Sequence, residues 1–434
     1  MRRTTMKLTK TGSKRAARGL GLGVLGVAVL AAGCDFEVTN PGPIQEQFLE
    51  ESLAQPAVVN GMGRALAQGL NWLAYTGAAV TREIHPAGST AAFGISNEWS
   101  QGELRTDDRN LDTHWNQSSR ARWLAESGVA RLERVGSDSP TLLVQARLWA
   151  GYANRLMGEH YCEAVIDGGS IQPRSEYLDR AERYFSAALE TASGDLRFAA
   201  LAGRASIRVH QGNWSGAAAD AAQVPTDFDY FVPYFSVGSD DQRNRIAWAG
   251  AGTPYRAHTI WNTQWEGYGL SNQNPDGDPR IPYSYTPGET GDAAIECCGR
   301  VPFKRQQKYP TDAADIRLSS GREMRLVEAE AQLIAGSWTQ AMTIINGLRT
   351  RVGMDEVTAA NADEAWTHLK RERAIELWLE GRRMGDRFRW NATGAPGSFH
   401  ELELPGASSN LVRQDFCFPI PPSERETNPN VPVG

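Results

Sequence analysis

The sequence lacks the short motifs by which many enzymes are recognised. It contains no H-E-x-x-H, no G-x-S-x-G and no C-x-x-C, so it shows neither a zinc-protease pair, nor a nucleophile elbow, nor a paired-cysteine zinc site. Its seven histidines show no close ligand spacing. We therefore expect a protein that is not an enzyme, binds no metal and needs no cofactor.

Long apolar runs and an excess of basic residues are also missing. With 41% hydrophobic and 22% charged residues and a mean hydropathy of −0.44, the 434-residue chain is globular rather than disordered or polytopic. Its formal charge is −6, yet residues 1–33 carry seven basic residues and no acidic one. Residues 34–434 therefore carry −13, and a charge of this sign repels the phosphate backbone of nucleic acids, so we expect no nucleic-acid partner.

The N-terminus is typical of an export signal. A basic segment up to Arg18 precedes the apolar run 19–32, which is short for a membrane span, and Gly33-Cys34 follow. The four residues before Cys34 resemble a bacterial lipobox, with Ala31 in place of the usual branched aliphatic residue. We predict a signal peptide of residues 1–33 and lipidation of Cys34, which would anchor the protein to a membrane; plain secretion is the alternative.

Helical periodicity dominates the chain from residue 140 onward. One apolar face repeats at steps of three and four over 178–189, and the next segment ends at Gly212, a residue suited to a helix C-terminus. The pattern of a glycine that ends a helix, an aromatic plug and a small alanine occurs at 212–217 and 336–341, and more weakly at 158–164. These patterns predict irregular tetratricopeptide-like helix pairs at about 140–225 and 320–390.

Residues 225–315 form a different kind of segment, rich in proline, glycine, asparagine and aromatics. We expect a loop-rich insertion with short strands and a binding surface. Within it, Asn272–Asp278 resembles the start of a calcium loop, but Tyr283 stands where a bidentate acid is needed, so Asn/Asp turns are favoured.

Two aromatic and polar regions, at 72–99 and at 261–285, have the composition of a sugar-binding surface. Flat rings stack on sugars, while polar groups bond their hydroxyls. The alternative is that the rings plug the core or a protein interface. The candidate ligand-binding residues are Trp72, Arg82, Trp99, Trp261, Trp265, Tyr268 and Tyr283.

The segment 371–390 carries alternating charges at helical spacing. Arg373, Glu376, Glu380 and Arg383 share one face of a predicted helix. Structural ion pairing is the favoured interpretation; paired catalytic carboxylates and a solvated charged face are the alternatives.

Four cysteines remain besides Cys34, an even number in an exported chain: Cys162, Cys297, Cys298 and Cys417. They allow three pairings. A bond between the adjacent Cys297 and Cys298 is strained, so we favour a pairing in which Cys162 and Cys417 each bridge one of them. Free thiols and a metal site stay open as alternatives.

Several separated motifs resemble the SusD/RagB family over nearly all of residues 34–434. They are N-P-G-P-I at 40–44, E-R-x-x-E-L-x-x-E-G-x-R-x-x-D-x-x-R-W at 372–390 and I-P-x-S-E-x-x-x-N-P-N at 420–430. The resemblance implies an all-α, SusD-like single domain over 34–434 and a lipoprotein exposed on the outer membrane. It further implies that the protein binds nutrient oligosaccharides or peptides and passes them to a SusC-like TonB-dependent transporter.

A second hypothesis comes from the helical repeats alone. Helix pairs often present surfaces to other proteins, so the chain could be a scaffold lipoprotein for envelope assembly that binds no nutrient. The two hypotheses differ in whether the aromatic residues contact a ligand.

Overall fold

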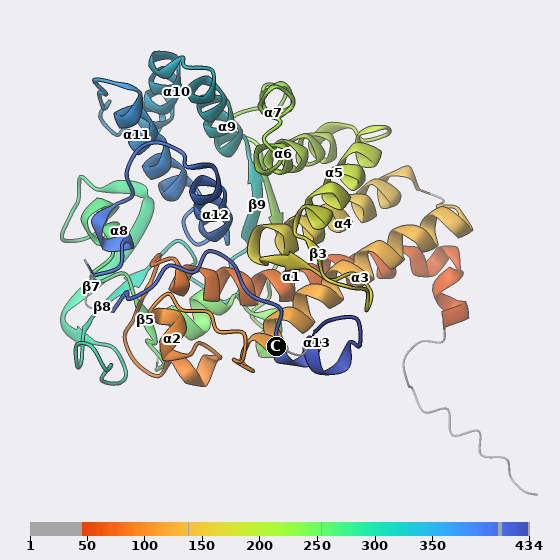
Figure 1. Ribbon diagram of the computed structural model, residues 1–434, viewed down its shortest axis with the longest axis horizontal. Coiled ribbons are helices and arrows are strands. Elements are labelled where there is room, and N and C mark those ends of the chain that lie inside the picture. The colour runs from red at the N-terminus through yellow and green to blue at the C-terminus, as the bar shows by residue number, and fades with distance from the viewer. Residues whose placement is uncertain (1–45, 138, 253, 407–409, 433–434) are drawn as a thin grey trace, which may run out of the picture. The chain divides into compact units, whose positions relative to one another are not determined.

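The computed structural model describes residues 46–137, 139–252, 254–406 and 410–432. The predicted signal peptide and Cys34 lie outside these residues. Helices dominate the described chain and sheets are small (Figure 1), which confirms the predicted all-α fold class with a loop-rich insertion. The main helices are α1 (Gln55–Val80), α2 (Asn97–Ser100), α3 (Leu111–Val135), α4 (Pro140–His160), α5 (Ser175–Leu189), α6 (Gly194–His210), α7 (Trp214–Ala221), α8 (Gln264–Tyr268), α9 (Gly321–Ile334), α10 (Trp338–Arg351), α11 (Ala362–Glu376), α12 (Arg383–Thr393) and α13 (Pro422–Thr427).

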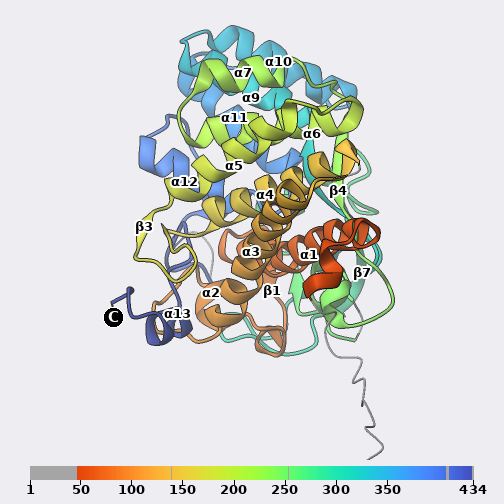
Figure 2. The same cartoon turned by 90° about the vertical axis from the view of Figure 1, so that its right-hand side faces the viewer.

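Helices that follow one another in the chain mostly pack side by side (Figures 1 and 2). α1 packs on α3 and α4, and α4 packs on α5; α6 and α7 continue the row, and α7 meets α9, which packs on α10 and α11. Within the described part of the chain, no helix has both the length and the hydropathy that a membrane crossing needs.

The predicted helical hairpin of α5 and α6 is confirmed. Phe185 of α5 is buried on the expected face, and Gly212 and Gly336 follow α6 and α9 with the positive φ that glycine tolerates. The prediction for Gly158 is wrong, since α4 continues to His160. A Cβ at Gly158 would lie 2.6 Å from a Leu178 methyl carbon, so this glycine serves close helix packing.

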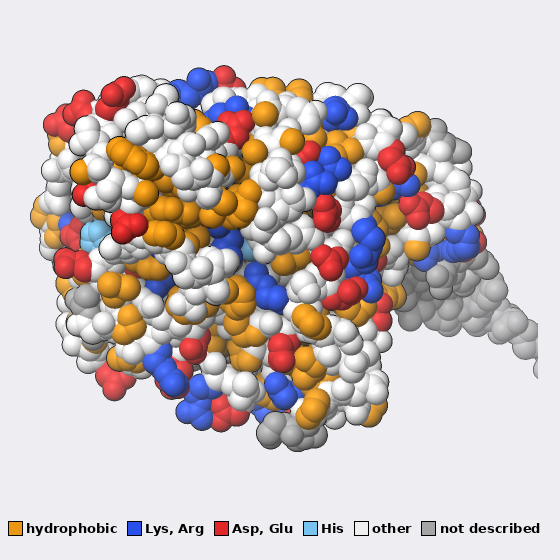
Figure 3. Space-filling model, turned by 45° about the horizontal axis from the view of Figure 1, so that its top comes forward, with side chains coloured by type: hydrophobic (Ala, Val, Ile, Leu, Met, Phe, Trp, Pro, Cys, Tyr) orange, Lys and Arg blue, Asp and Glu red, His pale blue; other side chains and the backbone are white. Residues whose placement is uncertain are grey.

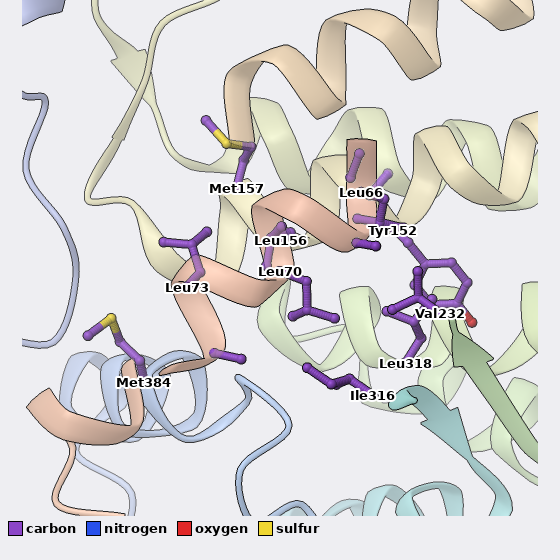
Figure 4. Packing of buried hydrophobic residues seen from close by; sticks show 14 of the residues in the cluster. Leu66, Leu70, Leu73, Tyr152, Leu156, Met157, Val232, Ile316, Leu318 and Met384 are labelled. Atoms are coloured by element: carbon purple, nitrogen blue, oxygen red, sulfur yellow. The ribbon is translucent and has the colours of Figure 1, made fainter. Parts of the chain in front are cut away.

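The main hydrophobic core joins α1 and α4 to a two-stranded sheet. Figure 4 shows leucines of α1, such as Leu70, facing Leu156 of α4 and Ile316 of strand β9 (Ile316–Ser320), with Met384 of α12 nearby. A second cluster lies among α9, α10, α11 and α12 and includes Trp390. Burial of these faces from water is the main source of stability.

Residues 225–315 contain strands, turns and the short helix α8, as their composition predicts; most of the strands are short, but β7 runs over 13 residues. Strand β9 pairs antiparallel with β4, β5 with β1, and β7 with β8, while β6 runs parallel to β7. The strands are β1 (His85–Pro86), β2 (Glu163–Ala164), β3 (Gln172–Pro173), β4 (Asp229–Val232), β5 (His258–Thr259), β6 (Gly269–Leu270), β7 (Asp278–Thr290), β8 (Pro302–Gln306) and β9 (Ile316–Ser320).

The expected cysteine pairing is wrong. Cys162 is bonded to Cys417, and Cys297 to Cys298. The reason is backbone pairing: the Cys162 amide donates to the Phe418 carbonyl at 3.0 Å, which sets the Cα atoms of Cys162 and Cys417 5.1 Å apart. The adjacent pair occupies a separate turn in the loop between β7 and β8.

Close helix packing gives a test with a matched control. A Cβ at Gly203 of α6 would lie 2.4 Å from the Phe185 ring, whereas one at Gly347 of α10 meets nothing within 4 Å. We expect Gly203→Ala to lower the free energy of unfolding by about 1–3 kcal/mol and Gly347→Ala to raise it by up to about 1 kcal/mol. Urea unfolding followed by circular dichroism measures both; equal effects would contradict the packing described.

Candidate functional site

The region at 72–99 contains three candidate ligand-binding residues, and two of them lie in the core. Trp99 is 0% exposed and meets the ring of His114 edge-on, so the prediction that it contacts ligand is wrong. Arg82 is 1% exposed, which also removes it from a solvent-facing surface; burial lowers its pKa to about 9. Trp72 is half-buried beneath the Arg245 guanidinium, 3.5 Å from the ring centre.

The insertion candidates divide in the same way. Trp265 packs on Trp378 in the core, and Tyr283 is buried with its hydroxyl donating to the Glu266 carbonyl, so both predictions are wrong. Trp261 is half-buried and meets His85 edge-on. The last candidate, Tyr268, is half-buried and lines a cavity. Trp265 and Tyr283 are buried for a general reason: large aromatic rings bury much apolar area and therefore often fill a core.

The cavity at Tyr268 has a volume of about 130 Å³, and we call it the Tyr268 pocket. It lies where α8 of the insertion meets α11, α12 and the segment after α12. Its lining residues are Gln264, Tyr268, Thr367, Lys370, Arg371, Arg383, Ser398, Phe399, His400 and Glu403.

Aromatic rings and unused donors face each other in the Tyr268 pocket. The ring of Tyr268 stands edge-on to His400, 5.9 Å away. The Nε2 of Gln264 and the Nε of Arg371 are buried and have no hydrogen-bond partner in the described parts of the chain. Buried donors are normally bonded, so each of these two nitrogens has a hydrogen bond left to make that the described residues do not supply.

The Tyr268 pocket is also electropositive. It holds Lys370, Arg371 and Arg383 against a single carboxylate, Glu403. Glu403 accepts two hydrogen bonds from Arg383, at 2.9 and 2.7 Å, and Lys370 donates to the carbonyls of residues 395 and 397. Burial, reinforced by the charge of Arg383, lowers the pKa of Lys370 to about 8. The pocket therefore favours an electron-rich or anionic group.

A larger cavity of about 310 Å³ lies at the ends of β9 and α11, and its glutamates are engaged in ion pairs. Glu380 binds Lys308 at 2.6 Å and Arg317 at 2.7 Å, and Glu376 binds Arg317 and Arg322. Paired in this way, the carboxylates hold the fold together rather than offering an acid and a base for catalysis.

The prediction of structural ion pairing over 371–390 is confirmed, but the single helix is not. α11 ends at Glu376 and α12 begins at Arg383, because Leu379 and Gly381 adopt φ of 61° and 70° between them. Across this break Arg373 pairs with Asp386 at 2.9 Å. On the surface, basic and acidic side chains are interspersed over the face that Figure 3 shows.

Comparison with known proteins supports the resemblance noted from the motifs. The sequence model described as the SusD family matches residues 304–432, the part of the chain that contains these ion pairs. No curated protein is found that matches the chain in sequence.

Solved structures extend the likeness to most of the chain. A SusD superfamily protein from Parabacteroides distasonis ATCC 8503 has a TM-score of 0.63 at 14% identity, covering 88% of this chain and 98% of its own. A SusD-like carbohydrate binding protein from Bacteroides vulgatus ATCC 8482 has a TM-score of 0.54 at 15% identity, covering 78% and 83%. A third structure, with xylogluco-oligosaccharide, has a TM-score of 0.63 at 14% identity, covering 88% and 99%.

The resemblance to the SusD/RagB family is confirmed. The described chain has the SusD fold, and its C-terminal part carries the family's sequence pattern. Identities of this size establish the fold and leave the ligand to be argued from the pocket.

Sequence reasoning missed most of the residues that build the Tyr268 pocket of this SusD-like chain. Gln264 stands between two candidate tryptophans, so its position in an aromatic and polar stretch was a usable signal. Arg371 lies next to the family pattern at 372–390. Phe399 and His400 carry no local signal, because they reach the pocket through contacts with residues distant in sequence, such as the bond of the Ser398 amide to Thr367.

The possible calcium loop behaves as a set of turns. Asn274 donates from its side chain to the Gly269 carbonyl at 3.1 Å, and its main chain bridges to Ser271. Asp278 is bonded by Arg280 through both carboxylate oxygens, so these oxygens have a cationic partner already.

Five histidines of the SusD-like body are buried as neutral rings. Burial lowers the pKa of His85, His114 and His258 to about 3 and that of His160 and His210 to about 4. For His85 the charge of Arg82 adds to the effect of burial.

These histidines predict acid sensitivity. The unfolded chain binds protons near pH 6.5 while the folded chain does not until about pH 3–4, so stability falls as pH drops through this window. At pH 5 each ring costs roughly 2 kcal/mol relative to neutral pH. Urea unfolding at pH 7.5 and pH 5 measures the loss, which His258→Gln should reduce by about one such step; His400→Gln, at a half-buried ring, serves as the control. An unchanged loss in His258→Gln would contradict the assignment.

Proposed function

We propose that this chain is a cell-surface lipoprotein that binds oligosaccharides at the Tyr268 pocket and releases them unchanged. The observation that carries the proposal is the combination, in one small cavity, of accessible aromatic side chains with buried donors that have no partner in the described residues. Sugars present this same combination of C–H faces and hydroxyl oxygens. A cavity of about 130 Å³ is smaller than pockets that enclose whole ligands, so it would hold one unit of a longer chain.

The charge of the pocket suggests the kind of sugar. Three cationic side chains face one carboxylate, and that carboxylate is already bonded to Arg383. A guanidinium binds a carboxylate through two parallel hydrogen bonds, and Arg371 has an unused buried Nε. We infer that oligosaccharides with acidic units are bound more tightly than neutral ones of equal length.

Structural neighbours support sugar binding in general terms. One is described as a SusD-like carbohydrate binding protein, and another was solved with xylogluco-oligosaccharide. Their fold is the one seen here, so the same scaffold accommodates such ligands elsewhere.

Localisation and partner are inferred from the N-terminal sequence and from the family. A lipidated Cys34 would hold the protein on the outer membrane, exposed at the cell surface. By the family resemblance its partner would be a SusC-like TonB-dependent transporter, which receives the ligand. Release to the transporter requires that binding is reversible. A protein that releases its ligand unchanged needs no catalytic carboxylate, which fits the engagement of Glu376 and Glu380 in ion pairs.

Two other functions remain as outcomes of the test. A peptide with acidic side chains could use the same cations and rings. A scaffold for envelope assembly would need neither, so a change confined to the Tyr268 pocket would leave its activity intact.

The first prediction concerns the ring of Tyr268. Tyr268→Ala should weaken binding of an acidic oligosaccharide about 30-fold, since truncating a central tyrosine costs about 2 kcal/mol. Isothermal titration calorimetry on a matched panel of acidic oligosaccharides, neutral oligosaccharides and acidic peptides measures it. Tyr285→Ala, a half-buried tyrosine of β7 outside the pocket, is the control and should bind normally.

Three outcomes would contradict the proposal. If no oligosaccharide binds, the protein is not a sugar-binding protein. If peptides bind more tightly than sugars, its ligand is a peptide. Equal losses in Tyr268→Ala and Tyr285→Ala would place the ligand elsewhere.

The second prediction concerns the anchor. In bacteria that process lipoproteins and are fed an alkyne-tagged fatty acid, the wild-type chain should carry the label and sediment with membranes, because only the Cys34 thiol lies at the lipobox. Cys34→Ser should lose both properties. A wild-type chain without label, or a variant that keeps it, would refute lipidation.

A further inference from the structure

Three potential metal ligands from distant parts of the chain meet beside the β1–β5 pair. A ring nitrogen of His85 and the Sγ atoms of Cys297 and Cys298 all lie within 4.8 Å of one another. Within the described residues this is the one cluster of histidine, cysteine or acidic ligands of that kind. His85 is fully buried in β1, paired with Thr259 of β5.

The loop that carries the two cysteines is fastened to the segment after His85. The Ser89 amide donates to Asp292 at 2.9 Å, and the Asn97 side chain donates to Glu296 at 2.7 Å. A Cβ at Gly88 would lie 1.5 Å from an Asp292 oxygen, so only glycine allows this approach. The sulfur atoms are thus held near the imidazole by contacts on both sides.

The imidazole of His85 is oriented as a metal ligand usually is. Its Nδ1 lies 2.6 Å from the Pro86 carbonyl oxygen. A carbonyl can only accept, so Nδ1 carries the proton and Nε2 carries the free lone pair. This Nε2 is buried and has no hydrogen-bond partner among the described residues, and the Trp261 ring packs edge-on against the imidazole. Donation of a hydrogen bond from the non-ligating ring nitrogen to a backbone carbonyl is an arrangement that orients metal-binding histidines.

Arg82, three residues before His85, carries a buried positive charge without a described counter-ion, and this charge acts on His85. All three guanidinium nitrogens of Arg82 are buried and lack hydrogen-bond partners within the described parts of the chain. A buried charge is costly unless it is compensated, so the surroundings of His85 favour a net negative centre.

We propose that, when the Cys297–Cys298 disulfide is reduced, the two thiolates and His85 Nε2 bind one cuprous ion. A dithiol reductant supplies two electrons and two protons, becoming a disulfide itself, and the two cysteines become thiols. Binding of Cu⁺ then releases both thiol protons. Thiolates select this soft ion, and two thiolates with Cu⁺ carry a net charge of −1, which matches Arg82; Zn²⁺ would leave the centre neutral and Arg82 uncompensated.

The test uses the full chain with Cys34→Ser, so that the N-terminal thiol does not interfere. After treatment with a dithiol and its removal without air, competition with bicinchoninate for Cu⁺ should show one tightly bound ion per chain, and none in the untreated protein. X-ray absorption of the copper complex should show two sulfur ligands and one nitrogen ligand.

Variants separate this site from other thiols. His85→Gln should weaken Cu⁺ binding at least about ten-fold, and Cys297→Ser with Cys298→Ser should abolish it. Cys162→Ser with Cys417→Ser, at the other disulfide, should bind normally.

Several results would overturn the proposal. These are the absence of stoichiometric Cu⁺ binding after reduction, a spectrum without a nitrogen ligand, tighter binding of Zn²⁺ than of Cu⁺, or loss of copper only in the Cys162/Cys417 variant. The X-ray spectrum of the wild-type chain decides the question even if His85→Gln fails to fold. Sugar binding at the Tyr268 pocket is measured separately, so either idea can fail without the other.

Discussion

Buried ion pairs around the break between α11 and α12 tie α12 to α4 and α9 in this SusD-like fold. Arg382 reaches Glu159 of α4 at 3.0 Å and Glu323 of α9 at 2.9 Å, while Arg389 of α12 binds Glu330 of α9. Charges removed from water are costly unless both partners stay in place. The helices that carry them are therefore fixed relative to one another, and their spacing cannot drift without exposing an unpaired charge.

The Tyr268 pocket depends on the same constraint. Arg383, the first residue of α12, binds Glu403 with both carboxylate oxygens, and this bond draws the segment with Phe399 and His400 toward α11. On the opposite side, α8 is held by Trp265, which packs on Trp378 within the break. Three elements that are distant in sequence thus converge on one cavity, and each is positioned by a buried contact rather than by the ligand.

Local patterns in the sequence predicted the features that local physics determines. The helical face of α5, the glycine after α6 and the pairing of alternating charges follow from spacing and residue type, and the structure has them. The break after Glu376 was not predictable from periodicity, since Leu379 adopts a left-handed conformation against its own preference. Its amide instead binds the buried Glu83 at 2.8 Å, a partner from the other end of the chain.

The candidate site shows the same limit more sharply. Composition drew attention to aromatic residues, yet it could not separate Trp99 or Trp265, which fill the core, from Tyr268, which lines a cavity. The cysteine pairing failed for a related reason, because it follows the long-range backbone pairing of Tyr161 with Phe418. The burial of each aromatic ring and the pairing of the cysteines both depend on contacts between residues that are distant in sequence.

The central claim is that ligand binding occurs where α8, α11 and α12 meet. A crystal structure of the protein with the tightest-binding acidic oligosaccharide tests it most directly. The account predicts one sugar unit against the Tyr268 ring, with its carboxylate within hydrogen-bonding distance of Arg371 and an oxygen near Gln264 Nε2. A sugar bound at any other surface, with this cavity holding only solvent, would contradict it.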